Sequence, residues 1–250
     1  MNMDRLDQII SLVSQEKKID VNTLSEKLNV SKVTIRKDLN KLEHKGLLHR
    51  EHGFAVLNSG DDLNIRLSYN YNIKKRIAAE AVKLVEDNET IMIESGSTCA
   101  LLAEAICRHR RNVRIITNSC FIANYTRKYS SCQVILLGGI YQQNSEVTVG
   151  PLLKEIIKLF HVKTLFAGTD GFDETLGFMG VDMMRCEVVQ YMCDSADHLV
   201  VLTDSSKFSK RSLVHQFSFN QVSQVITDSN LTVEQQKLLS SHGISVTCID

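Results

Sequence analysis

The first group of residues that could do chemistry is a basic stretch near the N-terminus. From residue 31 to residue 53 the sequence holds six lysines and arginines and three acids. Arginine and lysine can read the edges of guanine bases or hold the phosphates of DNA. The side chains that we predict to contact DNA are Lys32, Thr34, Arg36, Lys37, Lys41, Arg50 and His52.

The second group consists of short polar segments that each follow an apolar run. Glycine lets a backbone approach a ligand closely, hydroxyl groups offer hydrogen bonds, and the start of a helix attracts anions. The sequence therefore predicts a site for a small polar or anionic ligand. Its expected residues are Glu94, Gly96, Ser97, Thr98, Asn118, Gly138, Gly139, Thr169, Asp170, Asp204 and Lys207.

Three short helices must position the basic group. Apolar residues recur every three or four positions in residues 6–13, which predicts a helix with one buried stripe. Asp20 is placed to cap a second helix, and Asn29 can adopt the left-handed conformation that ends it. Ser31 then caps a third helix. Residues 20–39 therefore predict a helix-turn-helix, with the basic side chains on the outer side of its second helix.

A hairpin is expected directly after these helices. Residues 47–50 and 54–57 are short strand-like runs on either side of Glu51, His52 and Gly53. A basic helix face is by itself more often a solvated surface than a DNA contact. The coincidence of three helices, a turn and a hairpin favours a winged helix-turn-helix, because each feature has its own physical role in DNA binding.

Apolar runs alternate with helical segments in the rest of the chain. Such alternation predicts a mainly parallel sheet with helices on both faces, so the fold class is α/β. The polar segments lie at the carboxyl ends of the strands, where an open parallel sheet forms its ligand crevice. A plain helix cap is the alternative for each segment taken alone. The expected strands are residues 90–93, 113–117, 133–137, 164–167, 198–203, 222–227 and 245–249.

The segment VSKVTIRKDLNKLEHKGLLHREHG resembles the recognition helix and wing of the DeoR family of bacterial transcriptional regulators. Similar motifs follow in the family's order over nearly the whole chain. They are Arg66 and Lys75, Glu94 to Thr98 (ESGST), Thr117 and Asn118, Gly138 and Gly139, Gly168 to Gly171 (GTDG), Glu187 to Met192, and Asp204 to Lys207 (DSSK). The chain departs from the family pattern in having Glu94 for Asp and Phe54 for a wing glycine, and in lacking a basic residue between Glu187 and Met192.

The resemblance implies a two-domain transcriptional regulator. A small polar cluster at residues 58–62 separates a winged helix-turn-helix domain, residues 1–58, from an effector-sensing and oligomerisation domain, residues 59–250. The larger domain is expected to be similar to ribose-5-phosphate isomerase and to bind a phosphorylated sugar or related metabolite, with Glu187 among its ligand residues. The family implies a repressor of a carbohydrate-utilisation operon, with activation as the alternative.

One small reading domain makes few base contacts with DNA. We therefore expect a homodimer or homotetramer that binds repeated half-sites in double-stranded operator DNA. The effector and the operator would each favour a different arrangement of the same oligomer, so each would weaken the binding of the other.

The composition is that of an ordinary cytoplasmic protein, with 43% hydrophobic residues, 23% charged residues and a net charge of zero. No stretch approaches about eighteen consecutive apolar residues, and no signal pattern opens the chain, so we expect no membrane contact. The seven cysteines include no C-x-x-C pair, which argues against a disulfide framework or a metal site. No cofactor is expected, because the chain has no P-loop and no G-x-G-x-x-G segment.

An isomerase-like enzyme with an attached DNA-binding domain is the main alternative. Asp170, Asp173, Glu174 and Lys207 are residue types that could move protons next to a sugar carbonyl. Acids in a turn are more often caps, and a sensor must hold its ligand rather than convert it, so we predict no catalytic residue. A protein that coats DNA without selectivity is a third class, but such a protein would carry a strong positive charge and need no large sheet.

Overall fold

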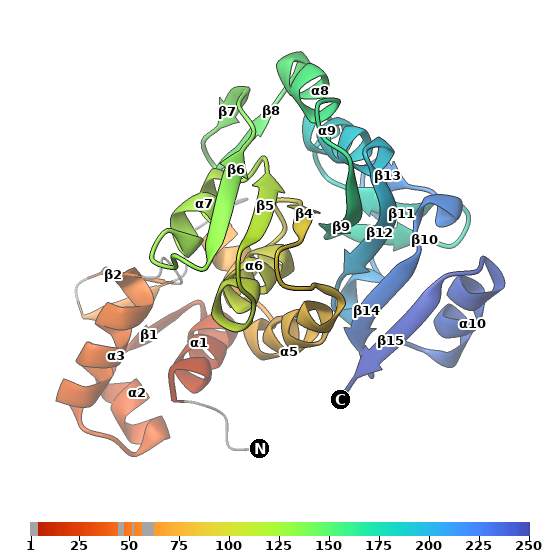
Figure 1. The fold of residues 1–250 in the computed structure, drawn as a ribbon. Helices are drawn as coiled ribbons and strands as arrows, with labels where there is room; N and C mark the ends of the chain where they lie inside the picture. The colour runs from red at the N-terminus through yellow and green to blue at the C-terminus, as the bar shows by residue number, and fades with distance from the viewer. Residues whose placement is uncertain (1–4, 45–47, 52, 57–62) are drawn as a thin grey trace. The chain divides into compact units, whose positions relative to one another are not determined.

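The computed structural model describes residues 5–44, 48–51, 53–56 and 63–250. By its contacts the chain divides into two compact units, residues 1–72 and residues 73–250 (Figure 1). The polar cluster at residues 58–62, where we predict the domain boundary, lies outside the described residues.

Short polar side chains set the helix boundaries of the N-terminal unit. The carboxylate of Asp20 accepts hydrogen bonds from two amides of the following turn, at 2.8 and 3.2 Å. Asn29 has a φ of 50°, and Ser31 Oγ accepts a hydrogen bond from the Thr34 amide at 3.2 Å. The predicted caps and turn are confirmed. The helices of this unit are α1 (Arg5–Glu16), α2 (Val21–Leu28), α3 (Lys32–His44) and α4 (Leu63–Ser68).

The predicted wing is a hairpin held by a further strand. Strand β3 (Phe54–Val56) pairs antiparallel with β2 (His49–Glu51) on one side and with β1 (Lys18–Asp20) on the other. Gly53 turns the hairpin with a φ of +89°, a conformation that favours glycine. Strand β1 is an addition to the prediction, because a three-residue segment is too short to show a periodic pattern.

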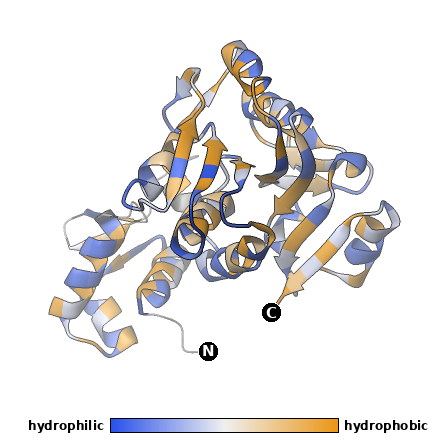
Figure 2. Cartoon of the chain, in the orientation of Figure 1, coloured by the Kyte–Doolittle hydropathy of each residue, from blue (hydrophilic) through white to orange (hydrophobic). Residues whose placement is uncertain are grey.

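The centre of the C-terminal unit is a parallel sheet of seven strands in the order β15-β14-β12-β9-β4-β5-β6 (Figure 1). Each predicted run forms one of these strands, so the prediction of a mainly parallel sheet is confirmed. Figure 2 shows hydrophobic residues along these strands, as expected where helices cover a sheet. The strands are β4 (Thr90–Ile93), β5 (Val113–Thr117), β6 (Cys132–Leu136), β9 (Val162–Ala167), β12 (Ala196–Leu202), β14 (Gln224–Asp228) and β15 (Ser245–Ile249).

The strand order reverses direction between β4 and β9. From β4 the chain adds β5 and β6 on one side, and from β9 it adds β12, β14 and β15 on the other. Parallel crossovers are right-handed, so this reversal sends the connecting helices of the two halves to opposite faces. The strand ends at such a reversal are where open parallel sheets bind ligands. Helix α5 (Tyr71–Ala81) begins in the last two residues of the first unit and continues into this one. The other helices of this unit are α6 (Ser97–His109), α7 (Cys120–Thr126), α8 (Pro151–Ile157), α9 (Met183–Asp194) and α10 (Val233–Ser241), with 3-10 turns η1 (Val82–Leu84), η2 (Ser205–Lys207) and η3 (Phe219–Gln221).

Two small antiparallel sheets extend the prediction. One pairs β7 (Ile140–Gln142) with β8 (Val147–Val149). The other has the order β10-β11-β13, from β10 (Gly171–Asp173), β11 (Gly177–Gly180) and β13 (Val214–Phe217). These strands have three or four residues each, too few to show a periodic pattern, and β10 and β11 also contain glycine.

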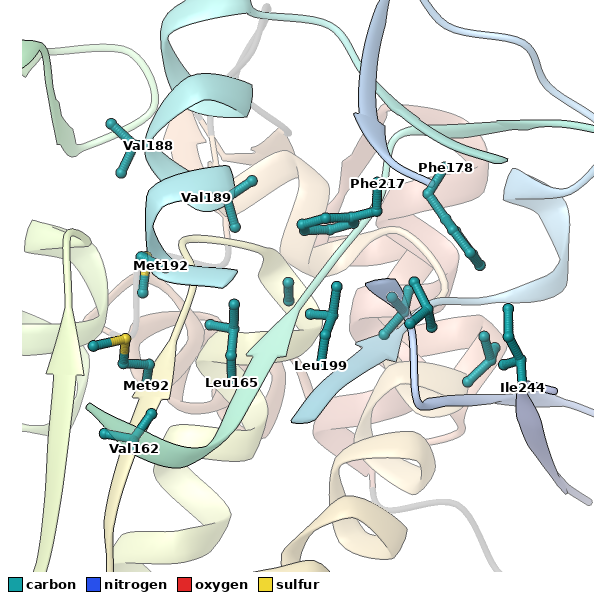
Figure 3. Close-up of a cluster of buried hydrophobic side chains, with 14 of the residues drawn as sticks. Met92, Val162, Leu165, Phe178, Val188, Val189, Met192, Leu199, Phe217 and Ile244 are labelled. Carbon is teal, nitrogen blue, oxygen red and sulfur yellow. The ribbon is translucent and has the colours of Figure 1, made fainter. Parts of the chain in front are cut away.

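The main core lies where α9 covers the middle of the large sheet. Val189 and Met192 of α9 lie over Leu165 of β9 and Leu199 of β12 in Figure 3, and all four are buried. Phe217 brings the small β13 sheet into the same cluster. The carboxyl ends of the central strands are thereby held in a rigid frame.

Within the described ranges, no helix combines the length and apolar character needed to cross a bilayer.

Candidate nucleic-acid interface and ligand crevice

Helix α3 has one apolar side and one basic side. Ile35, Leu39 and Leu42 are fully buried. The predicted DNA contacts of this helix lie outside this buried stripe and are exposed, except that Thr34 is half-buried. They are Lys32, Thr34, Arg36, Lys37 and Lys41.

The basic side chains of α3 differ in whether they already have hydrogen-bond or ion-pair partners within the described protein. Within the part of the chain that the structure describes, Arg36 and Lys37 have no hydrogen-bond or ion-pair partner. Lys41 Nζ lies 3.7 Å from Oδ1 of Asp38, a buried carboxylate that also accepts from Arg5 Nε at 2.6 Å. Arg36 and Lys37 can therefore meet a ligand without breaking an internal contact.

Val33 is a candidate contact that the sequence interpretation missed. It lies in the first turn of α3, between Lys32 and Thr34, and its side chain is 60% exposed. An apolar side chain on the outer side of a helix can touch the methyl group of thymine in the major groove. The available signal was its place outside the buried stripe of Ile35 and Leu39.

The wing packs against the end of α3. Arg50 Nη1 donates to Asn40 Oδ1 at 2.5 Å, and the Arg50 amide donates to Glu43 Oε1 at 2.8 Å. Lys18 Nζ of β1 lies 3.1 Å from Glu51 Oε2, which ties the third strand to the wing. Arg50 is thus placed beside the basic helix, while predicted contact His52 lies outside the described residues.

The polar segments of the larger unit follow the carboxyl ends of parallel strands. Glu94 follows β4 and Gly168 follows β9, the two neighbouring strands at which the order reverses. Asn118 follows β5, and Asp204 follows β12. The predicted ligand residues after these strands therefore lie along one edge of the sheet.

Glu94 joins the two loops at the reversal. Its Oε2 accepts hydrogen bonds from the Gly96 amide at 2.8 Å and the Gly168 amide at 3.2 Å, while Oε1 accepts from Ser95 Oγ at 2.7 Å. A Cβ atom at Gly96 would lie 3.0 Å from Glu94 Oε2 and 3.5 Å from Gly168 Cα, so the loops touch through glycine. Glu94 thus acts as a positioning residue, and it already uses the Gly96 amide of the expected anion cradle.

Helix α6 begins directly after this contact. Ser97 and Thr98 occupy its first turn and are buried. The first amides of a helix have no acceptor within the helix, so this turn offers donors to an anion. The structure thus brings Glu94, Gly96, Ser97 and Thr98 together at the reversal.

The loop after β9 adds polar atoms to the same place. The Thr169 hydroxyl is used inside the loop, 2.8 Å from the Gly171 carbonyl oxygen. Asp170 Oδ2 accepts a hydrogen bond from the Val181 amide at 3.3 Å. Burial, followed by the negative charges of Asp170 and Glu94, raises the pKa of Cys186 to about 12. The Cys186 thiol next to these acids is therefore neutral and not activated as a nucleophile.

The residues after β5 and β6 meet strand β8. Asn118 is buried, and its Nδ2 donates to the Thr148 carbonyl oxygen at 3.0 Å. A Cβ atom at Gly139 would lie 2.7 Å from the Val149 carbonyl oxygen, whereas one at Gly138 would meet no atom within 4 Å. Asn118 and Gly139 are thus needed for the approach of β8, and Gly138 is the open position of this pair.

The segment after β12 forms η2. Asp204 is buried and caps this turn through the Ser206 amide at 3.2 Å, and the half-buried Lys207 ends it. Asp228, at the end of β14, accepts from the Ser205 amide at 2.7 Å and was missed because it closes an apolar run. Burial opposes its charge, but hydrogen bonds from Ser205 and Asn230 hold the pKa of Asp228 below its usual value.

Glu187 contacts a residue of its own helix rather than the loops described above. It is exposed on α9, where its Oε1 accepts a hydrogen bond from Tyr191 Oη at 2.5 Å. Its role in ligand binding stays a prediction. Within residues 5–44, 48–51, 53–56 and 63–250, no group of three or more His, Cys, Asp or Glu is arranged to hold a metal ion.

Both halves of the chain match models of known domains. The DeoR-like helix-turn-helix domain matches residues 5–60, and the DeoR C terminal sensor domain matches residues 69–229. The chain is 30% identical over 248 residues to the L-fucose operon activator of Haemophilus influenzae, covering 96% of this chain and 97% of that protein. It is 28% identical over 245 residues to the glycerol-3-phosphate regulon repressor of Escherichia coli, covering 97% of each.

Among solved structures, the chain is similar to ribose 5-phosphate isomerase A from Neisseria gonorrhoeae. This similarity covers 55% of this chain and 54% of the isomerase, at 20% identity and a TM-score of 0.41. The relatives that match over nearly the full length are named as regulators, which favours the regulator interpretation over the enzyme alternative. With a helix-turn-helix in its first unit and a sensor domain in its second, the chain belongs to the DeoR family of bacterial transcriptional regulators.

Proposed function

We propose that the protein represses a carbohydrate-utilisation operon and that a phosphorylated sugar or related metabolite releases it from its operator. One observation carries this proposal: a single chain holds both an exposed basic helix face and a row of polar loops at the point where a parallel sheet reverses its strand order. Arg36 and Lys37 are open to DNA, and Glu94 and Gly168 border the point where the parallel sheet reverses. Such a chain can convert ligand binding into a change in DNA affinity.

On the DNA side, α3 enters the major groove. Arg36 reads a base edge, Val33 touches a thymine methyl group, and Lys32 and Lys37 hold phosphates. Arg50 and His52 extend the phosphate contacts into the wing. For Arg50 this requires exchanging its hydrogen bond with Asn40 for a phosphate oxygen.

On the effector side, the first turn of α6 and Lys207 are the candidate anion contacts. The names of the two relatives support a carbohydrate-related effector, since one concerns an L-fucose operon and the other a glycerol-3-phosphate regulon. One relative is called an activator and the other a repressor. Repression relieved by the ligand is proposed here because the family resemblance implies it, and activation is the alternative.

The proposed assembly is a homodimer or homotetramer that acts in the cytoplasm, where its operator lies. Two reading domains on two half-sites raise both affinity and selectivity. The effector weakens operator binding and the operator weakens effector binding by the same factor, because both act on one equilibrium.

The test is binding of the purified chain to DNA from its own upstream intergenic region, at one fixed salt concentration. Binding is measured with and without each of a panel of sugar phosphates. Selective binding that one compound abolishes supports the proposal. Failure to prefer this DNA over shuffled DNA, together with turnover of a panel member, would favour the isomerase-like enzyme instead. Tighter DNA binding in the presence of a compound would indicate an activator.

A further inference from the structure

An apolar surface surrounds Gly150 in the larger unit. Ile140 of β7, Leu152 of α8 and Met183 of α9 are 60%, 61% and 73% exposed, and we call these three side chains the Gly150 patch. A Cβ atom at Gly150 would lie 3.2 Å from Ile140 Cδ1 and 3.9 Å from Met184 Cε, so β7 and the start of α9 meet at this glycine. Figure 1 shows β7, β8 and α8 at the same end of the unit. Apolar side chains that are exposed together, rather than singly, mark an interaction surface.

Strand β7 adds a free backbone edge beside the patch. In the described chain it pairs with β8 alone, and Tyr141 lies opposite Thr148. The Thr148 amide donates to the Asn118 carbonyl oxygen at 2.9 Å, and the Thr148 carbonyl oxygen accepts from Asn118 Nδ2 at 3.0 Å. Because both groups of Thr148 point away from β7, Tyr141 must direct its own amide and carbonyl groups away from β8. No described residue forms a hydrogen bond with these two groups.

The charged side chains at the rim of the patch already have partners within the chain. Glu155 Oε1 lies 2.8 Å from Lys158 Nζ on α8. Asp182 Oδ1, at the start of α9, accepts from the Arg185 amide at 2.8 Å and lies 3.9 Å from Arg185 Nε. Lys154 Nζ lies 4.9 Å from the centre of an aromatic ring of α9. The surface therefore offers no excess of positive charge that would attract a nucleic acid.

A second copy of this chain matches these features. Two identical surfaces that meet across a two-fold axis bring the same residues together, so a charge near the axis would face its own copy. Residues 138–145, which include β7, read GGIYQQNS and carry no charged side chain. Two β7 edges can thus approach without repulsion. Their antiparallel pairing is self-complementary, because each Tyr141 amide can donate to the Tyr141 carbonyl oxygen of the other copy.

We propose that the Gly150 patch and the free edge of β7 form the contact between two copies of the C-terminal unit. The inference rests on the proposed function, which requires two DNA-binding domains in one assembly. The two β7 strands pair antiparallel through Tyr141, and Ile140, Leu152 and Met183 become buried around them. The interface is isologous, so each substitution in it acts twice in one dimer.

The test counts the chains in each particle by sedimentation equilibrium, for the full wild-type chain and three variants. Met183→Glu places a carboxylate at the first position of α9, where negative charge stabilises a helix, so the fold should be retained. Ile140→Glu probes the same contact from β7. Val233→Glu is the matched control, because Val233 is also apolar, 58% exposed and the first residue of a helix, α10. Thermal unfolding checks that each variant is folded.

Met183→Glu and Ile140→Glu should each raise the dissociation constant of the contact about a hundredfold or more, because two like charges face each other. Each should halve the number of chains per particle, while Val233→Glu should leave it unchanged. In the wild-type chain, the Tyr141 amide should exchange with deuterium more slowly above this dissociation constant than below it. Folded variants that keep the wild-type assembly, or Tyr141 exchange that does not depend on association, would overturn the inference.

Operator binding separates this inference from the proposed function. A wild-type chain that is monomeric but binds its operator selectively would overturn the interface and leave the regulator in place. An assembly that Met183→Glu separates, in a wild-type chain without selective DNA binding, would support the interface and reject the regulator.

Discussion

At the residue scale, DNA recognition separates side chains that read bases from side chains that hold phosphates. A guanidinium can bind O6 and N7 of guanine together, whereas a lysine ammonium acts as a compact charge. Arg36 is exposed and unengaged within the described chain, and Lys41 is drawn toward Asp38. Removing Arg36 should therefore affect DNA selectivity, whereas removing Lys41 should affect the salt dependence of DNA binding.

Arg36→Ala is expected to cost about 1–3 kcal/mol of operator binding, because one bidentate base contact is lost. The loss should be confined to the operator, with non-specific DNA affected much less. Dissociation constants for operator and shuffled DNA at one salt concentration measure both effects. A loss of the same size on both DNAs would assign Arg36 to the phosphates.

Lys41→Ala is expected to weaken binding to all DNA and to reduce the slope of log affinity against log salt by about one unit. The physical reason is the loss of one displaced counterion. Lys158→Ala is a matched control, since Lys158 pairs with an acid three residues away, as Lys41 does, but lies in the other unit. An unchanged slope for the Lys41 variant would remove that residue from the interface.

At the element scale, one carboxylate joins α6 to the segment after α7. Glu104 Oε1 accepts from Tyr129 Oη at 2.8 Å, from Arg108 Nη2 at 3.0 Å and from Lys128 Nζ at 3.4 Å. Burial opposes the charge of Glu104, but these contacts prevail and hold its pKa below the usual value. The charged form is therefore the one that stabilises the fold.

Glu104→Gln is expected to lower the free energy of unfolding at pH 7 by about 2 kcal/mol, as for a lost charged hydrogen bond. Because the folded pKa lies below the unfolded value, the stabilisation is complete above about pH 5 and disappears as the pH falls through the folded pKa. Urea unfolding at pH 7 and pH 3 measures the difference between wild type and variant. The difference should shrink at pH 3; a constant difference would show that packing, not charge, is responsible.

The elements that could be predicted are those whose pattern is long enough to be read. Seven apolar runs give the seven parallel strands, and the caps at Asp20, Asn29 and Ser31 follow from local hydrogen bonding. The strands β1, β10 and β11 have only three or four residues, and tertiary pairing alone creates them. The Gly150 patch could not be predicted for a similar reason, since only the tertiary structure brings β7, α8 and α9 together.

For the predicted ligand residues, the sequence could show where they lie in the sheet but not which hydrogen bonds they already make. Strand ends placed Glu94, Gly96 and Asp204 at one edge, as the topology of a parallel sheet requires. The sequence could not show that Glu94 is already hydrogen-bonded to the Gly96 and Gly168 amides, because that contact joins residues far apart in the chain. Acceptors that serve the fold and acceptors left for a ligand look alike until their partners are known.

At the scale of the whole molecule, regulation requires the crevice and the operator to influence one equilibrium. Gly96→Leu is expected to disrupt the loop contact, because even an added Cβ atom would lie 3.0 Å from Glu94 Oε2. The factor by which the effector weakens operator binding, typically about 5–150, should fall toward one. Operator titrations with and without the effector measure this factor. Release that proceeds as in the wild type would show that the crevice has been misplaced.

The third strand of the wing constrains how such regulation can work. Strand β1 leads directly into α2, and the Val21 amide at the start of α2 donates to the Gly53 carbonyl oxygen at the wing turn, at 3.2 Å. The wing and the helix-turn-helix therefore move as one rigid DNA-binding domain. The wing cannot separate from the helices without fraying the start of α2. In the proposed homo-oligomer, an effector must then change the distance or angle between two DNA-binding domains, so the induced protein should still bind an isolated half-site while losing the full operator.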